Sequence, residues 1–265
     1  MKIGFIGLGN MAKAIIGGLV NKGIVKPEEI IGSAKTEATK QKVAKEFGIT
    51  VLANNKEVAS QSDILFLAVK PIFFPEVMAE IKDSIRKDTL VISVAAGKSI
   101  AYIEEGLSIP ELKLVRCMPN TPALVGEGCT GVCVNKNVSA EETDKALEII
   151  SSFGKAYLVP ESLMDVVCAV SGSSPAFVFM FIEAMADGAV HGGMPRKQAY
   201  EFAAQAVLGS AKLVLETGKH PGELKDMVCS PGGTTIEGVK VLEECGLRAA
   251  LMDAMEATIE KSKNL

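Results

Sequence analysis

Two segments of the chain, one near each end, have residue types and spacings suited to chemistry. The first, Gly7-Leu8-Gly9-Asn10-Met11-Ala12, is a G-x-G-x-x-A motif directly after an apolar run. Its first glycine permits a tight turn, its second lets the backbone approach a pyrophosphate, and its small third residue lets a helix pack on a strand. The N–H groups that open the following helix then face the pyrophosphate charge. The motif predicts a dinucleotide site, with a ligand-free structural turn as the alternative.

The second segment is Ser230-Pro231-Gly232-Gly233-Thr234-Thr235. Two glycines before a helix start present several unpaired N–H groups, which can form a nest for a carboxylate. The hydroxyl of Thr235 can then hydrogen-bond a ligand. The alternative is a helix N-cap in which Thr234 satisfies its own helix and nothing binds.

The residues about 20 positions after the glycine motif indicate which dinucleotide is bound. An NAD site usually has Asp or Glu there to bind the ribose hydroxyls. This chain has Gly32-Ser33-Ala34-Lys35-Thr36 instead. With no carboxylate to repel it, a 2′-phosphate can take hydrogen bonds from Ser33 and Thr36 and charge from Lys35. We predict NADPH in preference to NADH, with NADH still possible; the alternative is that Lys35 is an ordinary solvated lysine.

Further loops should also face the dinucleotide, because ligands of open α/β sheets lie beyond the carboxyl ends of the strands. Val69 and Lys70 lie at one such end, and Ala95 and Ala96, whose small side chains allow close approach, lie at another. Asn55 lies in a loop that can reach the adenosine side. For each of them, ordinary loop chemistry is the alternative.

The chain offers little for a metal or for a histidine-based mechanism. Its two histidines, His191 and His220, each lack a second ligand at helical spacing. The six cysteines contain no C-x-x-C pair, which favours buried free thiols over a disulfide framework. We expect no metal site.

The elements that position these residues follow from the pattern of apolar runs. Over residues 2–159, β-rich runs alternate with helical ones, which predicts a Rossmann-like, doubly wound parallel sheet. Strands are expected at Lys2–Ile6, Glu29–Ile31, Thr50–Leu52, Ile64–Val69, Leu90–Val94, Leu114–Met118 and Val132–Asn135, and helices at Met11–Lys22, Glu37–Phe47, Pro75–Ile85 and Glu141–Phe153. After Pro160 the β signal disappears. The predicted domains are an α/β domain, residues 1–159, and an all-helical domain, residues 160–265.

The helical domain predicts a homo-oligomer. Pro175, Pro195 and Pro221 each mark an expected helix start. The helix from Pro175 to Gly192 has Glu183 and Asp187 as its only charged residues, four apart on one face. A helix that is apolar on most sides must be covered on most sides, and about a hundred helical residues can hardly do this alone. The alternative is a monomer that uses the α/β domain as cover.

Composition excludes several classes of protein. Lys and Arg number 28 against 32 Asp and Glu, a net charge of −4, without the basic excess that nucleic-acid binding requires. The uncharged stretch 166–182 is interrupted at 171–175, which leaves fewer than the ~20 apolar residues of a membrane span. Lys13 and the glycines near it argue against a secretory leader at the N-terminus. We expect a cytoplasmic protein that binds neither nucleic acid nor membrane.

Several motifs together resemble one enzyme family. Gly4–Met11 is shared by several dehydrogenase families and does not separate them. The separation comes from Leu67–Pro71, Arg116–Pro122, Ser171–Ala176 and above all Leu224–Asp226 followed by Val228–Thr235. Together these segments resemble the pyrroline-5-carboxylate reductases, and the resemblance extends from the first strand to about Leu251.

The resemblance implies NADPH-dependent reduction of the cyclic imine pyrroline-5-carboxylate to L-proline, the last step of proline synthesis. It implies an active site between the two domains, dimers formed through the C-terminal helices, and decamers built from them. The cofactor contacts it implies are Ile6, Gly7, Leu8, Gly9, Asn10, Met11, Ser33, Asn55, Val69, Lys70 and Ala96. The implied substrate contacts are Glu161, Ser230, Gly233, Thr234 and Thr235. Met227 departs from the family, where Asn is frequent and touches the nucleotide.

The chemistry of an imine fits this set of residues. A protonated imine accepts hydride at carbon and becomes a neutral amine, so no strong general acid is required. The site needs a place for the carboxylate and a partner for the ring nitrogen, the role expected of Thr235 as the catalytic residue. Glu161 is expected to hold the substrate amine, with a surface glutamate as the alternative.

Two other functions start from the same dinucleotide site. A β-hydroxyacid dehydrogenase would need a lysine early in the first long helix of the second domain, and residues 172–187 contain none. A redox-sensing NADP-binding protein would bind NADPH without oxidising it when the imine is added.

Overall fold

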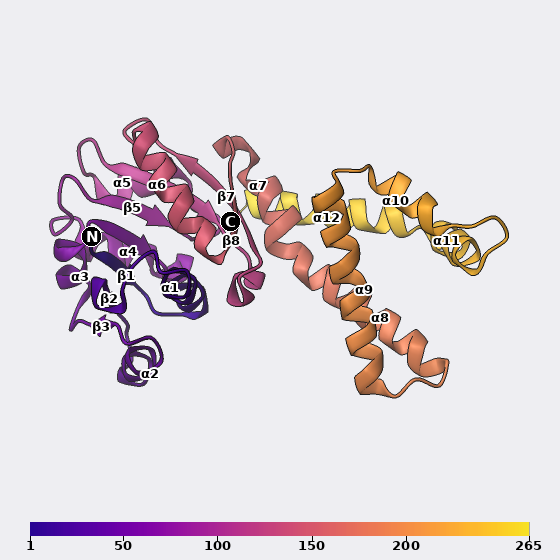
Figure 1. The fold of residues 1–265 in the computed structure, drawn as a ribbon. Helices are drawn as coiled ribbons and strands as arrows, with labels where there is room; N and C mark the ends of the chain where they lie inside the picture. Colours follow the sequence, from indigo (N-terminus) through magenta and orange to yellow (C-terminus); the bar gives the residue numbers. More distant parts are fainter. Residues whose placement is uncertain (265) are drawn as a thin grey trace. The chain divides into compact units, whose positions relative to one another are not determined.

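The structure is a computed structural model that describes residues 1–264. The described residues form two compact units, one of residues 1–173 with 258–264 and one of residues 174–257. Figure 1 shows the sheet and its helices in the first unit and helices alone in the second. The expected order, an α/β part followed by a helical part, is confirmed.

The first unit contains one eight-stranded sheet of order β3-β2-β1-β4-β5-β6-β7-β8. The strands are β1 Ile3–Ile6, β2 Ile30–Ser33, β3 Thr50–Val51, β4 Ile64–Leu67, β5 Leu90–Ser93, β6 Lys113–Met118, β7 Gly128–Val134 and β8 Gly154–Leu158. Neighbours pair in parallel except β6 and β7, which are antiparallel. The expected Rossmann-like sheet is therefore present.

Helices cover both faces of this sheet (Figure 1), which explains the continuous apolar runs of its strands. One face is covered by α1 Asn10–Asn21, α2 Glu37–Phe47 and α6 Ala140–Ile150. The other is covered by α3 Asn55–Gln61, α4 Phe74–Ile81 and α5 Ile100–Leu107. Successive strand residues alternate between the two cores, and Phe5 of β1 stacks on its partner Phe66 of β4 with ring centroids 4.8 Å apart.

The last strand was not expected. Neither a strand nor a helix was assigned to Gly154–Leu158, which forms β8 at the sheet edge beside β7. Its residues are half-buried or exposed, so it lacks the continuous apolar run that marks a strand covered on both faces. The antiparallel pairing of β6 with β7 also corrects the expectation of a wholly parallel sheet.

The helical unit contains α8 Ser174–His191, α9 Arg196–Thr217, α10 Pro221–Val228, α11 Thr234–Glu244 and most of α12 Leu247–Lys263. Helices α8 and α9 pack against each other. The end of α12 belongs to the first unit, where the Ser262 hydroxyl donates to Asp165 at 2.7 Å. Pro221 opens α10 as expected, whereas Pro195 immediately precedes α9 as its N-cap.

The predicted break at Ser171–Pro175 is wrong. A helical run continues from α7, Met164–Val167, through a π-helical turn, Cys168–Ser173, into α8. Pro175 has no N–H for the carbonyl of Ser171 four residues earlier, so an ordinary α-helix would leave that carbonyl unpaired. The side-chain amide of Asn120 supplies the missing donor, at 2.9 Å. The amide oxygen of Asn120 accepts the N–H of Cys129 at 2.8 Å, so both ends of this side chain are used.

The uninterrupted helix also changes the membrane argument. Residues 161–191 are long and apolar enough to cross a membrane by length and composition, and among the described residues this is the one such helix. A helix whose apolar side chains are covered by a second chain has the same composition. The interruption on which the sequence argument relied does not exist.

Candidate functional site

The glycine motif forms the turn from β1 into α1. Gly7 has φ +92°, and a Cβ built there would lie 2.8 Å from the carbonyl oxygen of Ala68. Both observations restrict this position to glycine. Gly9 is the N-cap of α1, and a Cβ built on it would meet no atom within 4 Å. The turn is therefore tight at Gly7 and open at Gly9, as the approach of a pyrophosphate requires.

The start of α1 fits an anion. Its first backbone bond runs from the N–H of Lys13 to the carbonyl of Gly9 at 3.0 Å, so the N–H groups before Lys13 precede the helical ladder. No acidic residue lies in the first turn. The donors and the helix dipole at this end therefore suit the charge of a dinucleotide.

A cleft of about 650 Å³ opens beside this turn. It is lined by ten residues that the sequence predicted: Gly7, Leu8, Gly9, Asn10, Ser33, Lys35, Thr36, Asn55, Val69 and Lys70. Among the described residues, the predicted contacts Ile6, Met11, Ala95 and Ala96 are not part of its lining. Ile6 and Ala95 are almost completely buried, so only a backbone group of either is suited to a ligand.

The cleft also contains residues that the sequence analysis did not select. Lys13, Thr39, Lys40, Phe73, Glu76 and Glu80 line it. The Nζ of Lys35 lies 5.6 Å from the ring centroid of Phe73, within cation–π range. Lys13 lies four residues after Gly9, one turn into α1, and Lys40 lies one turn into α2, so helical spacing is the signal that could have selected both.

The charges of the cleft favour an anionic ligand. Lys13, Lys35, Lys40 and Lys70 contribute four positive charges, and Glu76 and Glu80 contribute two negative ones. Thr36, the N-cap of α2, accepts the N–H of Thr39 at 3.3 Å. The first turn of α2 therefore adds backbone donors beside Lys35 and Lys40.

Three residues from three elements form a hydrogen-bonded chain in the same cleft. The hydroxyl of Ser33, at the end of β2, donates to Oδ1 of Asn55 at 2.7 Å. Nδ2 of Asn55, the first residue of α3, donates to Oε2 of Glu80 on α4 at 2.6 Å. The Ser33 hydroxyl hydrogen is therefore bonded to Asn55, whereas the sequence led us to expect it to bond a 2′-phosphate.

Glu161, predicted to bind the substrate, has other partners in the structure. Its Oε1 accepts Nη1 of Arg116 at 2.8 Å and the N–H of Ile100, at the start of α5, at 2.7 Å. Burial, with the Glu161 charge adding to it, raises the pKa of Cys133 to about 11. The Glu161 carboxylate thus joins β6 to the N-terminus of α5. Because its pKa is raised, Cys133 is a neutral thiol at neutral pH.

The segment 230–235 forms the entry to α11. Gly233, not Thr234, is the N-cap, and no side-chain hydrogen bond caps the helix. The N–H of Gly233 donates to the carbonyl of Ser230 at 3.0 Å, and Gly232 has φ +66°. Thr234 and Thr235 are exposed at the start of the helix. The alternative in which Thr234 caps its own helix is therefore wrong, and the open N–H groups of the first turn remain for a ligand.

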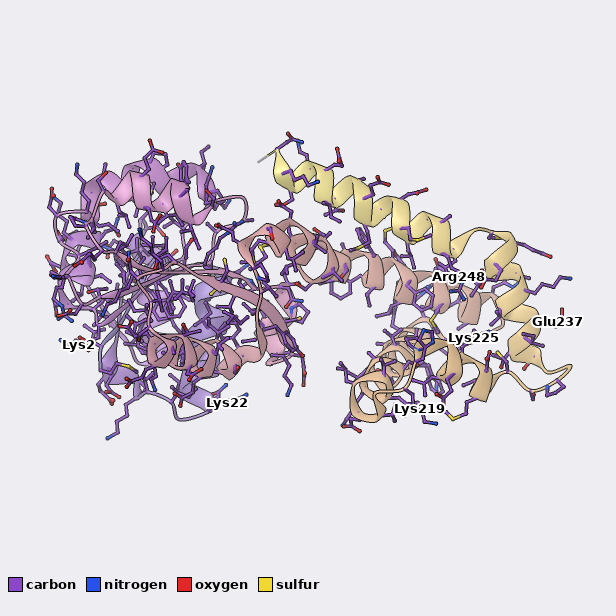
Figure 2. The ribbon with its side chains drawn as sticks, turned by 90° about the horizontal axis from the view of Figure 1, so that it is seen from above. Lys2, Lys22, Lys219, Lys225, Glu237 and Arg248 are labelled. Carbon is purple, nitrogen blue, oxygen red and sulfur yellow. The ribbon has the colours of Figure 1, made fainter. Side chains whose placement is uncertain are left out.

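The helices next to this segment carry charged residues. Figure 2 labels Lys225 of α10, Glu237 of α11 and Arg248 of α12 in the helical unit. Lys225 forms an ion pair with Asp226 at 2.8 Å, which raises the pKa of Lys225, while the nearby positive charge of Arg248 opposes that rise. Arg248 also contacts Glu243 at 2.7 Å.

Comparison with known proteins identifies the family. A family model described as pyrroline-5-carboxylate reductase dimerisation matches residues 161–265, and one described as NADP oxidoreductase coenzyme F420-dependent matches residues 2–97. The pyrroline-5-carboxylate reductase of Escherichia coli strain K12 is 54% identical over 264 residues, which cover 100% of this chain and 98% of that protein. The chain belongs to the pyrroline-5-carboxylate reductase family. The resemblance inferred from its motifs is confirmed.

Solved structures of the family share its fold. A pyrroline-5-carboxylate reductase from Coxiella burnetii superposes with a TM-score of 0.93 at 34% identity, covering 99% of this chain and 97% of that one. The Plasmodium falciparum enzyme, solved with NADP bound, gives a TM-score of 0.88 at 35% identity, covering 100% and 97%. The pyrroline-5-carboxylate reductase fold thus extends over the whole chain.

Proposed function

We propose that this protein reduces L-1-pyrroline-5-carboxylate to L-proline with NADPH, the last step of proline biosynthesis. The observation that carries the proposal is the full-length 54% identity to a protein of that name, together with the glycine-lined, positively charged cleft. NADPH supplies the hydride when bound. The imine carbon accepts the hydride, the ring nitrogen carries the proton, and the C=N bond becomes a C–N bond.

The residues of this chain fit the cofactor. The Gly7–Ala12 turn and the start of α1 present N–H groups to the pyrophosphate, and Lys35 with Thr36 supplies charge and donors for the 2′-phosphate. The remaining proposed contacts are Ile6, Ser33, Asn55, Val69, Lys70, Ala95 and Ala96. Residues 1–159 are proposed as the NADP-binding domain.

Residues 160–265 are proposed as the dimerisation and substrate domain. The open first turn of α11, with Ser230, Gly233 and Thr234, is suited to the substrate carboxylate, and the Thr235 hydroxyl to the ring nitrogen. Glu161 is better suited to hold Arg116 and the start of α5, from which it supports the fold. The proposed assembly is a dimer through the C-terminal helices, with decamers built from it, and the proposed location is the cytoplasm.

The absorbance of NADPH tests the reaction. Adding L-1-pyrroline-5-carboxylate should consume NADPH with equal formation of L-proline. A flat absorbance trace with NADPH binding retained would contradict the reductase and would instead support an NADP-binding protein without catalysis.

Thr235 gives a sharper test of the substrate contact. Thr235→Val removes the hydroxyl and keeps the side-chain shape, and should lower kcat/KM by about 5- to 150-fold, equivalent to ~1–3 kcal/mol. Thr235→Ser keeps the hydroxyl and should retain most of the activity. Equal losses in the two variants would contradict a role for the hydroxyl.

A further inference from the structure

The hydrogen-bonded chain of Ser33, Asn55 and Glu80 has a direction that its chemistry determines. A carboxylate only accepts hydrogen bonds, so Glu80 must face the NH₂ group of the Asn55 amide. The carbonyl oxygen of that amide then faces Ser33 and also only accepts. Ser33 must therefore donate its single hydrogen to Asn55, and its lone pairs are left for other donors.

The Ser33 oxygen, whose lone pairs remain free to accept, lies in the cofactor cleft. Ser33 is 2% exposed, lines the cleft, and lies at the end of β2. At this place many dinucleotide folds have a carboxylate that accepts the ribose hydroxyls. The sequence lacks an acidic residue there, but α4 supplies one, Glu80, whose effect reaches Ser33 through Asn55.

From this arrangement we infer that Glu80 is a positioning residue for the dinucleotide. It holds the Asn55 amide so that the Ser33 oxygen accepts a hydrogen bond from an adenosine ribose hydroxyl. Because NADPH and NADH share a ribose hydroxyl, this contact serves both. Discrimination between the two nucleotides then belongs to the cations and donors of the β2–α2 turn, Lys35 and Thr36, with Lys40.

The hydrogen-bond partners of Glu80 and Asn55 support assigning Ser33 to the ribose hydroxyl and the lysines to the 2′-phosphate. Oε2 of Glu80 is occupied by Asn55, and Asn55 has no second amide oxygen to offer, so the three residues present acceptors and a negative charge. Such a set suits a ribose hydroxyl, which can donate a hydrogen bond to the Ser33 oxygen.

Fluorescence titration with NADPH and with NADH, without the imine, tests the inference. Glu80→Gln has the same shape but can turn either end of its amide toward Asn55, so the direction of the chain is lost. We expect the Kd of both nucleotides to rise by the same factor, about five- to thirty-fold, with Tm little changed. Lys35→Ala should raise the Kd of NADPH alone.

A double-mutant cycle with Ser33→Ala tests whether Glu80 affects nucleotide binding through Ser33. If Glu80 acts through Ser33, Glu80→Gln should add little to the Kd of the Ser33→Ala variant. Tighter NADPH binding by Glu80→Gln would show that Glu80 acts as a repelling charge, and an unchanged Kd would show that it does not act; either overturns the inference. So would a loss confined to NADPH.

The inference rests on the proposed use of NADPH, but its test does not require the reaction. Nucleotide binding with the expected Kd changes and no oxidation on adding the imine would overturn the reductase proposal and support the role of Glu80. A wild-type protein that binds neither nucleotide would overturn both.

Discussion

The two units of the chain differ in how far their apolar residues are buried. In the first unit every residue of β1, β2, β4 and β5 is buried. In the helical unit the structure describes all of α8 and α9, yet Ala186 is the one buried residue of α8, and Ala199 and Ala203 are those of α9. The first unit therefore has its own core, whereas the second exposes the surface that another chain would cover.

Exposed aromatic and methionine side chains show the difference most clearly. On α8, Phe179 is 63% exposed and Met180 is 69% exposed, and Phe202 of α9 is 62% exposed. An apolar groove between the two helices is lined by Phe181, Met185, Ala206, Val207, Ser210, Ala211 and Val214. Family membership gives this surface its explanation, because the dimerisation model of the family matches this part of the chain.

The largest effect is expected when this surface is charged. Phe181→Asp should place an unpaired carboxylate in the interface of each subunit, at a cost of about 3–5 kcal/mol per site. Light scattering at micromolar concentration should show loss of the oligomer, and imine reduction should fall with it. NADPH binding to the isolated chain should persist. Val125→Asp, at a 77% exposed apolar residue of the first unit, is the matched control and should keep the assembly.

Substitutions in the glycine turn of the first unit should instead weaken NADPH binding. Gly7→Ala forces a side chain to adopt φ +92° and places Cβ against the Ala68 carbonyl, which should lower stability by at least ~1–3 kcal/mol and weaken NADPH binding. Gly9→Ala meets no protein atom, so its Tm should stay near that of the wild type while nucleotide affinity falls. An equal loss of Tm in the two variants would contradict the division between tight and open glycines.

An intermediate effect is expected at the helical run that leaves the first unit. Asn120→Ala removes the donor to the Ser171 carbonyl and should cost about 1–3 kcal/mol in the free energy of unfolding. Pro175→Ala restores a backbone N–H four residues after Ser171, so Asn120→Ala should cost less in that background. Denaturant unfolding of the four proteins measures the coupling, and strictly additive losses would exclude it.

The smallest effect is expected at Asp63, immediately before β4. Asp63 accepts the N–H of Lys2 at 2.7 Å and the guanidinium of Arg86, and these contacts lower its pKa below the ordinary value of 3.8. A lowered folded-state pKa contributes stability above the unfolded-state value and loses it as pH falls through the folded-state value. Asp63→Asn should therefore lower Tm slightly at neutral pH and not at pH values below the lowered pKa; a Tm difference independent of pH would contradict this.

Much of the first unit could be predicted because its signals are local. The Gly7–Ala12 motif, the continuous apolar strands and the alternation of helix with strand are patterns within short windows. Gly154–Leu158 could not be predicted in this way, since an edge strand has neither a buried run nor clean alternation. The same limit applies to the uninterrupted helix at Pro175, because its stabilising donor, Asn120, is 51 residues from the carbonyl that it satisfies.

The sequence by itself determined the fold class, the family and the ten predicted residues that line the cleft, because each depends on residue types at fixed local spacing. Only the tertiary structure decided which side chains are already occupied. It gave the Glu161 carboxylate to Arg116 and Ile100, and the Ser33 hydrogen to Asn55. It also brought Glu80 from a third element to the end of β2. Hydrogen-bond partners far apart in the chain meet only when the sheet and its helices pack, so no local pattern specifies them.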